Sequence, residues 1–461
     1  MIWFVACRVL ALSAVAAGVV SAPKALSGEP WSVVVRPGGV PLGVHLDLIS
    51  CLLLAFVGLL GWVVSRYSLT NLRGRLAFTG SGIRLFAALA GLLLTVSGAS
   101  LVTVAIGWTF SGHAVAALIA RSGTSRAGAA TQVMRRTLLI GDVFLWAGVV
   151  LAAFVLPSLE RSRMTGIDAG WGTSLVVALL LVACVARTGL VPAHRWLPET
   201  AEAPSPISGL LHAGVVNGTG VLVLLFWPLF SAAPQMMLVL LILGAASVVV
   251  GAWASRVRAD VKGRLACSTT SQMGYMCIEL GLGLPGAALL HLIGHGAYKS
   301  WLFMRAGGTV ARTRSAAMPT DRPRVRPVWT ALSAGVIAAV IALPATLILI
   351  RETGVTTIAA FALAVFTAAL AGGAVAGLRR VGPRHVWAVT ATAGCAAGIY
   401  VWLLLGVEKL LGVVWAPVPL WGPVASTLLV AALIGAGAIV SRGFNYLEVH
   451  PSSSLANRLL P

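Results

Sequence analysis

About fourteen apolar stretches, each about 20 residues long, follow one another along the chain and constrain its fold more than any other feature. They lie near residues 1–21, 43–66, 80–101, 102–120, 133–156, 171–190, 205–229, 234–254, 265–282, 287–305, 328–349, 356–378, 386–406 and 420–441. A run of that length crosses a bilayer as an α-helix, which satisfies its own backbone polar groups. Of the 461 residues, 58% are hydrophobic and 10% are charged, and the mean hydropathy is +0.94. We therefore predict an all-α, polytopic integral membrane protein with about 14 transmembrane helices.

The basic residues indicate how the chain is oriented in the membrane. There are 33 Lys and Arg against 13 Asp and Glu, a net charge of +20. The basic residues collect in the gaps after even-numbered runs, whereas gaps after odd-numbered runs are short or nearly neutral. The positive-inside rule then places both termini, and the loop at 306–326, on the cytoplasmic face of the inner (cytoplasmic) cell membrane, in contact with membrane lipids. Because this rule accounts for the positive charge, we expect no nucleic-acid partner.

The N-terminal run and the longest linker bear on the domain count. Residues 1–22 lack the basic start of a signal peptide, so we interpret them as a first membrane helix, although a peptide ending near Ser21 and Ala22 stays open. The segment at 318–327 joins two apolar runs rather than two soluble domains. We predict a single membrane domain over 1–461.

Motifs for cofactors are missing or incomplete in the sequence. The six cysteines lie singly in apolar runs, without a CxxC pair. GLGLPG at 281–286 has the spacing of a dinucleotide loop, but it falls in a tight turn between two apolar runs. His291 and His295 make half a zinc site, and no Glu or Cys nearby completes it. We expect no metal or other cofactor in this chain.

One apolar run carries a stripe of ionisable residues. In LHLIGHGAYKSWLFMRAG at 290–307, residues His291, His295 and Lys299 fall within about 80° on a helix and rise about 12 Å. Ionisable groups inside the membrane are costly and mark ion paths, although snorkelling or structural pairing is the alternative. Histidine exchanges protons near neutral pH, and a lysine in a low-dielectric site can release its proton. The stripe predicts proton or cation movement.

A second polar region is interrupted by prolines. Pro192, Pro198, Pro204 and Pro206 rule out a continuous helix across 187–220. Broken helices at membrane depth line water-filled cavities, so we add Arg187 and His212 to the predicted ion path. The predicted supporting polar residues are Asp47, Asp142, Glu199, Glu202, Asn217 and Lys262. For Asp47, Asp142 and Glu279, which the apolar runs place near helix ends, structural pairing stays the alternative.

Three motifs resemble the proton-translocating membrane subunits of respiratory complex I and the Mrp antiporters. They are RTGLVPAHRWLPETAEAPSPISGLLHAG at 187–214, DVKGRLACSTTSQMGYM at 260–276 and LHLIGHGAYKSWLF at 290–303. The resemblance covers about residues 40–305, and residues 306–461 are further predicted transmembrane helices of unassigned role. LLHAGVVNGTG at 210–220 and GWVVSRYS at 61–68 are most similar to the DabB family, the membrane subunit of a two-component inorganic carbon transporter.

The resemblance implies roles for individual residues. His212 matches the family's intramembrane histidine, and His291, His295 and Lys299 match its His, His, Lys helix. Two positions depart from the pattern: Arg187 replaces the antiporter lysine, and Thr109 replaces the glutamate of a Trp-Glu pair. Arginine hardly deprotonates, so Arg187 can influence a neighbour but cannot carry a proton. The loss of the carboxylate at Thr109 favours the DabB branch over a standard antiporter.

The function implied by the resemblance is cation (proton or sodium) translocation in an energy-coupled complex for CO2 or bicarbonate uptake. The enzymatic site, with its zinc, is expected on a soluble DabA-type partner, so this chain would be a transport subunit and not an enzyme. One alternative is a proton-pumping subunit of an NADH-quinone oxidoreductase or an Mrp-type antiporter. Another is a structural membrane anchor whose ion path has degenerated, as Thr109 and Arg187 would allow.

Overall fold

The computed structural model describes most of the chain as helices. The described residues are 1–71, 80–121, 125–258, 260–309, 333–341, 343–344 and 383–411. They fall into two compact units, the first from Met1–Gly281 and Ala288–Val310, the second from Leu282–Ala287 and Ala311–Gly412. All of the predicted site residues lie in the first unit. The single membrane domain stays a prediction.

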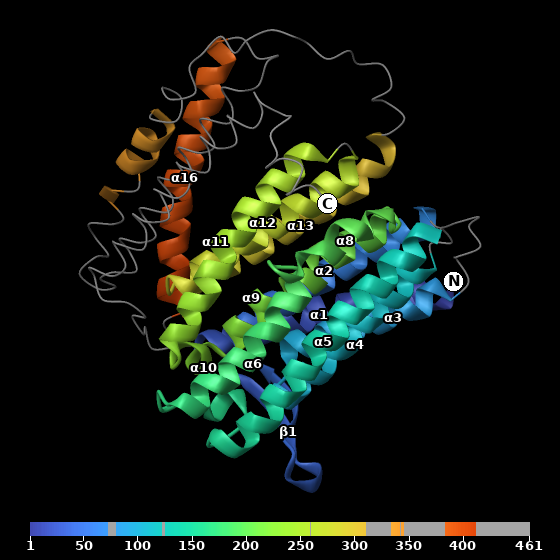
Figure 1. Cartoon of the computed structure of the whole chain (residues 1–461). Helices are drawn as coiled ribbons and strands as arrows, with labels where there is room; N and C mark the ends of the chain where they lie inside the picture. The colour runs from blue at the N-terminus through green and yellow to red at the C-terminus, as the bar shows by residue number, and fades with distance from the viewer. Residues whose placement is uncertain are drawn as a thin grey trace. The chain divides into compact units, whose positions relative to one another are not determined.

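Long helices lie side by side in the first unit (Figure 1). They are α1 (Ile2–Leu26), α2 (Leu48–Asn71), α3 (Ser81–Ser97), α4 (Leu101–Ala120), α5 (Ser125–Val155), α6 (Trp171–Thr188), α11 (Pro234–Val257), α12 (Val261–Gly281) and α13 (Pro285–Thr309). Eight of the described helical stretches are long and apolar enough to cross a membrane. The prediction of a multi-pass, helical membrane protein is therefore confirmed.

The count of about 14 spans stays a prediction. The predicted spans at 356–378 and 420–441 lie outside the described residues, as do half of the span at 328–349 and most of the loop at 306–326. Helices α12 and α13 are absent from the set of strongly apolar helices, because their polar side chains lower their hydropathy. Helix α13 is the one that carries the predicted stripe.

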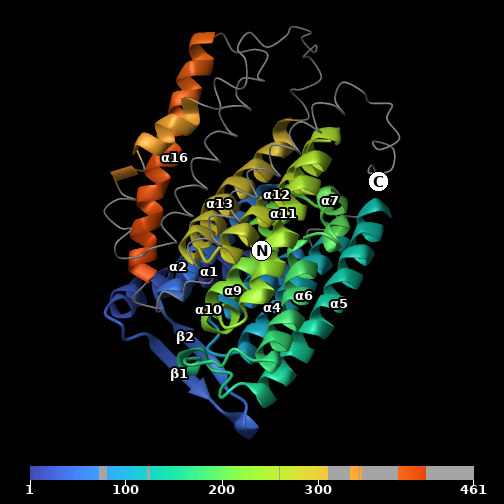
Figure 2. The same ribbon diagram turned by 60° about the vertical axis from the view of Figure 1, so that its left-hand side comes forward.

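A β-hairpin precedes α2 and extends from one end of the helices (Figures 1 and 2). Strand β1 (Trp31–Val35) pairs antiparallel with β2 (Leu42–Leu46), so that Trp31 faces Leu46. The consecutive valines of β1 favour extended backbone. The turn between the strands includes a 3₁₀ turn (Pro37–Gly39) in which Gly38 and Gly39 have φ of 60° and 84°, a region that favours glycine. The sequence analysis missed this hairpin.

The start of the predicted span at 43–66 was wrong for a local reason. Residues 42–46 form β2, and α2 begins only at Leu48. The Asp47 Oδ1 atom accepts a hydrogen bond of 2.8 Å from the backbone N–H of Ser50, which satisfies one of the free donors at the start of α2. Hydropathy alone extended the helix into the strand because both are apolar.

The predicted break across 187–220 is confirmed. Helix α6 ends at Thr188, and Gly189 adopts φ of 68° just after it. The chain then passes through short turns: a 3₁₀ turn (Ala193–Arg195), α7 (Trp196–Glu199) and a 3₁₀ turn (Thr200–Glu202). The next span is itself discontinuous, as α8 (Ser205–Ala213), a 3₁₀ turn (Val215–Asn217), α9 (Gly218–Leu225) and α10 (Trp227–Ser231). This second break places backbone polar groups next to His212 in the middle of the span.

The second unit is described mainly by α16 (Pro383–Leu411) and a helical segment at 333–341. Trp402 Nε1 donates a hydrogen bond of 3.1 Å to the backbone oxygen of Ile341, which joins the two. The Glu408 Oε1 atom accepts a hydrogen bond of 2.8 Å from the N–H of Gly286. The carboxylate therefore caps the first turn of α13.

Candidate functional site

A line of polar side chains runs between α12 and α13. The Glu279 carboxylate lies 3.0 Å from Nδ1 of His291; the Glu279 side chain is buried, and that of His291 is 10% exposed. The His291 and His295 rings meet edge to face with their centroids 5.8 Å apart. Lys299 follows one turn further along α13. The predicted stripe is therefore one face of α13, and Glu279, which the sequence left as either structural or functional, extends it.

Lys299 ends this line inside the protein. Its side chain is 2% exposed, and Nζ donates to the backbone oxygen of Leu265 at 2.9 Å and to Ser268 Oγ at 2.8 Å. Among the described residues, no carboxylate forms an ion pair with Lys299. Neutral acceptors stabilise a buried ammonium less than a carboxylate would, so this environment suits a lysine that exchanges its proton.

His212 reaches the same line from α8. Its ring stacks on Phe303 of α13, with centroids 4.2 Å apart and planes at 10°. A Cβ placed at Gly296 would lie 3.2 Å from the backbone oxygen of Ala213, so α8 packs closely on α13 at this point. The structure therefore brings together His212 and the His291–Lys299 stripe, which are separated by about 80 residues in sequence.

The two inner histidines have unused hydrogen-bonding capacity. His212 and His295 are buried, and neither ring nitrogen of either side chain has a hydrogen-bond partner in the structure. Buried polar atoms normally find a partner, so these ring nitrogens are positions at which a water molecule can bind. An imidazole with both nitrogens free is suited to accept a proton on one side and release it from the other.

Arg187 is buried away from the stripe, beside the break after α8. Its Nη1 donates to the backbone oxygen of Trp108 at 2.7 Å, its Nη2 to Ser111 Oγ at 2.7 Å, and its Nε to the backbone oxygen of Val215 at 3.3 Å. The guanidinium carbon lies 4.9 Å from the centre of the Trp108 ring. These contacts hold a fixed positive charge between α4, α6 and the broken span.

Asn217 and Arg187 both line a small cavity. The cavity is lined by Trp108, Arg187 and Asn217 among mostly apolar neighbours, with room for about one water molecule. The Asn217 Nδ2 donates to the backbone oxygen of Ala213 at 2.7 Å, while its buried Oδ1 has no partner. The Asn217 side chain thus binds the backbone oxygen of Ala213, which the break leaves without its helical partner. Its Oδ1 atom stays available as an acceptor in a residue that lines the cavity.

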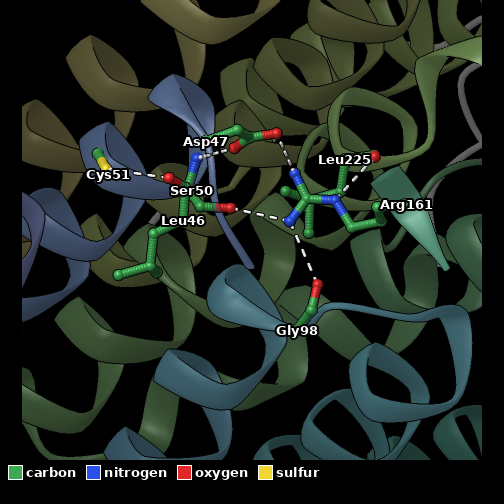
Figure 3. A network of polar contacts seen from close by, with 7 residues as sticks. All are labelled: Leu46, Asp47, Ser50, Cys51, Gly98, Arg161 and Leu225. Atoms are coloured by element: carbon green, nitrogen blue, oxygen red, sulfur yellow. Dashed lines mark hydrogen bonds and ion pairs between the residues drawn. The ribbon is translucent and has the colours of Figure 1, made fainter. Parts of the chain in front are cut away.

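Asp47 lies in a different network, which Figure 3 shows from close by. Its Oδ2 pairs with Nη2 of Arg161 at 2.5 Å. Arg161 also donates to Ser50 Oγ at 2.9 Å, to the backbone oxygen of Gly98 at 3.2 Å and to that of Leu225 at 3.1 Å. The buried ion pair of Asp47 and Arg161 therefore joins the start of α2 to the ends of α3 and α9. These contacts account for Asp47 structurally, and its part in an ion path stays a prediction.

Asp142 does not lie near a helix end, which corrects the expectation from the sequence. Helix α5 begins eight residues before the predicted span and places Asp142 in its middle. The carboxylate pairs there with His113 of α4, Nε2 to Oδ2 at 2.8 Å. The first turns of α5 are polar and lower its hydropathy, so the predicted helix was too short.

The remaining supporting residues lie at the loop between α6 and α8. Glu199 and Glu202 are exposed there and do not contact the stripe. Lys262, at the start of α12, donates to the backbone oxygen of Ala203 at 2.7 Å and so fastens the loop to α12. The supporting role predicted for Glu199 and Glu202 stays a prediction.

Ser268, Phe303, His113 and Arg161 are the contacts that the sequence analysis missed. Phe303 follows Lys299 at the helical spacing of four and could have been assigned to the same face. The other three act through partners on other helices, and a single sequence carries no signal for such pairings.

Among the described residues, no group of three or more His, Cys, Asp or Glu side chains is arranged to hold a metal ion. Zinc on a partner subunit stays a prediction.

Comparison with known proteins places these features in a family. Residues 98–378 match the family described as NADH:quinone oxidoreductase/Mrp antiporter, TM. The chain is 33% identical over 296 residues to the probable inorganic carbon transporter subunit DabB2 of Halothiobacillus neapolitanus, covering 62% of this chain and 53% of that protein. It is 30% identical over 288 residues to the probable DabB of Bacillus subtilis, covering 60% and 56%. The resemblance to DabB proteins is confirmed.

Other similar proteins come from respiratory and antiporter complexes. The chloroplastic NAD(P)H-quinone oxidoreductase subunit 5 of Ranunculus macranthus is 30% identical over 307 residues, covering 62% of this chain and 41% of that protein. The chain spans about half the length, or less, of these curated relatives.

A solved structure of the Mrp complex from Dietzia sp. shares the fold with a TM-score of 0.57 at 16% identity, over 92% of this chain and 76% of that chain. The membrane-bound sulfane sulfur reductase, an archaeal respiratory complex, does so with a TM-score of 0.59 at 19% identity, over 92% and 70%. Fold and sequence agree. The chain belongs to the NADH:quinone oxidoreductase/Mrp antiporter transmembrane family.

Proposed function

We propose that this chain is the cation-translocating membrane subunit of an energy-coupled inorganic carbon uptake complex. The observation that carries the proposal is the buried line from Glu279 through His291 and His295 to Lys299, joined by His212. Several ionisable groups at membrane depth are costly together, and a hydrated ion path gives them a use.

In the proposed mechanism, a proton moves between neighbouring polar groups. The Glu279 carboxylate and the His291 ring are already in hydrogen-bond contact. His295, with both ring nitrogens free, links His291 to Lys299 through water, and Lys299 passes the proton toward Ser268 on α12. His212 offers a branch toward the break after α8. Arg187 keeps its charge throughout and contributes a fixed field rather than a proton.

The inorganic carbon part of the proposal rests on the DabB-named relatives. The proposed partner is a soluble DabA-type zinc subunit, which would contribute the chemistry at CO2 or bicarbonate. The proposed cytoplasmic face carries arginine-rich gaps that can steer an acidic partner surface into place. The cation gradient would then drive the partner's reaction, and the chain itself would act as a transport subunit.

A second candidate is a subunit of a quinone oxidoreductase or an Mrp-type antiporter. It is favoured by the quinone oxidoreductase relative at 30% identity and by the shared fold with the Mrp complex. Thr109 weighs against a standard antiporter, because its hydroxyl only accepts a hydrogen bond of 3.2 Å from Trp146 Nε1 and cannot carry a charge. A pure scaffold would leave the unpaired His212 and His295 nitrogens without a use.

The experiment is purification of the tagged chain in mild detergent from its native cells, followed by identification of co-purifying proteins. We expect a large soluble zinc protein. Expressed together in cells lacking carbonic anhydrase, the pair should restore growth at ambient CO2, and collapse of the cation gradient should abolish that growth. Flavin and iron-sulfur subunits would instead establish the oxidoreductase alternative, and small Mrp-type membrane subunits the antiporter.

A further inference from the structure

We propose that His113 and Asp142 form a second proton-exchange site, on the pair of helices α4 and α5 and separate from the His291–Lys299 stripe. The inference rests on the proposed function, since it adds an entrance to the same cation path. Asp142 is one of the predicted supporting polar residues, and the proposal gives it a titrating partner in His113, which has no role in the sequence analysis.

The geometry is that of a proton-sharing pair. His113 Nε2 lies 2.8 Å from Asp142 Oδ2, and each residue sits well inside its helix. Both helices are long and apolar enough to span a membrane, so the pair lies at membrane depth. An ionisable pair at that depth is costly, and a path that uses it is the usual reason for its presence.

The two members of the pair differ in burial. The His113 side chain is 32% exposed and that of Asp142 is 10% exposed. The surface around them is apolar, with Phe110 and Val143 both exposed on the same helices. The imidazole is therefore open to the outside of this chain while the carboxylate lies behind it. This order suits uptake of a proton at the ring and its transfer inward.

An inward route exists beside the pair. Gly112 precedes His113, and a Cβ at Gly112 would collide with Nη1 of Arg187, so the guanidinium lies directly against α4 at this point. Asp142 is also within electrostatic range of Arg187. Arg187 in turn lines the cavity that Asn217 faces, next to the break after α8. The pair therefore adjoins the region that leads to His212.

The proton step is balanced within the two side chains. A proton on Nε2 of the imidazolium moves to Oδ2 of the carboxylate, which leaves a neutral imidazole and a neutral carboxyl group. The carboxyl group then releases the proton to water on the Arg187 side, and the ring takes up another proton from water that reaches its exposed edge, which restores the imidazolium and the carboxylate. Water is the only other reactant.

The test must separate proton exchange from simple joining of α4 to α5. His113→Gln keeps a side-chain N–H that can donate to Asp142 but cannot titrate. Thr109→Val is the matched control, because it removes the hydrogen bond from Trp146 Nε1, which joins the same two helices one turn away, without touching a titratable group. Asp142→Asn is a second variant in case the first does not accumulate.

The readout is proton flux into vesicles that contain the full chain with its co-purifying subunits. We expect His113→Gln and Asp142→Asn to lower flux about tenfold or more, and Thr109→Val to leave it nearly unchanged. If His113→Gln had the same flux as wild type while Lys299→Ala had none, this inference would be overturned and the proposed function would stand. Absence of flux in the wild type would overturn the proposed function and this inference with it.

Discussion

Two buried polar networks in the first unit differ in how completely they are satisfied. Around Arg161, the guanidinium is bound by the Asp47 carboxylate, one hydroxyl and two backbone oxygens. Around Lys299, the ammonium has only two neutral acceptors, and His212 and His295 have no partner on either ring nitrogen. We call the Arg161 network closed, because its charged groups are paired with one another and with further acceptors. We call the Lys299 network open, because several of its nitrogen atoms have no partner among the described residues.

The difference indicates which network is structural and which is available for transport. A closed network fixes one arrangement, because moving a proton or breaking a bond would leave a charge unpaired in a buried place. An open network has donors and acceptors that water or a proton can use without breaking existing bonds. The predictions below test this contrast by disrupting one network at a time.

Lys299→Ala should have the largest effect on transport. It removes the one lysine of the open network, so coupled growth at ambient CO2 should be lost in the co-expression assay. The protein should still accumulate in the membrane, because only two neutral hydrogen bonds disappear. Immunoblots of membrane fractions supply the control. Normal growth of this variant would rule out Lys299 as a member of the path.

Arg161→Met should have the largest effect on stability. It leaves the Asp47 carboxylate buried without its partner, which costs about 3–5 kcal/mol. Accumulation and the thermal unfolding temperature in detergent should both fall. The double variant Asp47→Asn with Arg161→Met should recover part of the loss.

A different result for Arg161→Met would contradict the structural role of this network. If the single variant were as stable as wild type but transported nothing, the closed network would belong to the ion path after all. Flux must therefore be expressed per folded molecule.

His212→Gln and His45→Gln compare one histidine from each region. His212 lies in the open network, and its loss should lower flux about tenfold. His45, in β2 near Asp47, is buried with its Nδ1 unpaired; burial and then the nearby Arg161 charge lower its pKa, so its ring is neutral at pH 7. Its replacement should leave flux per molecule unchanged. Equal losses in the two variants would mean that the distinction between the regions carries no functional information.

Phe303→Leu should lower transport less than His212→Gln does. The change removes the ring that stacks on His212 at 4.2 Å and leaves a small void, which costs about 1–2 kcal/mol. We expect flux to fall a few-fold because the histidine ring is less well oriented, and Phe303→Tyr should restore most of it. A Leu variant with full flux but reduced stability would limit Phe303 to packing.

The open network was largely predictable from the sequence, and the closed one was not. His291, His295 and Lys299 lie on one helix, where the period of 3.6 residues fixes their common face. The prolines around residues 192–206 likewise act locally and marked the break. By contrast, Asp47 and Arg161 are 114 residues apart, and nothing in either segment specifies the other.

Two further differences have the same physical origin. Hydropathy cannot separate an apolar strand from an apolar helix, so β2 was read as the start of a span. The length of α5 was underestimated because its first turns are polar, and Asp142 was therefore placed near a helix end. Pairings such as His113 with Asp142 depend on which helices become neighbours, which local periodicity does not determine.

The most direct test of the central claim is proton flux through reconstituted Lys299→Arg. Arginine keeps the positive charge and the hydrogen bonds to α12, but it does not release its proton. In vesicles with an imposed membrane potential and an internal pH-sensitive dye, wild type should acidify the lumen. The Lys299→Arg variant, at equal protein density and equal unfolding temperature, should not. Flux through Lys299→Arg at the wild-type rate would contradict the account, because the lysine would then supply only charge and not a proton.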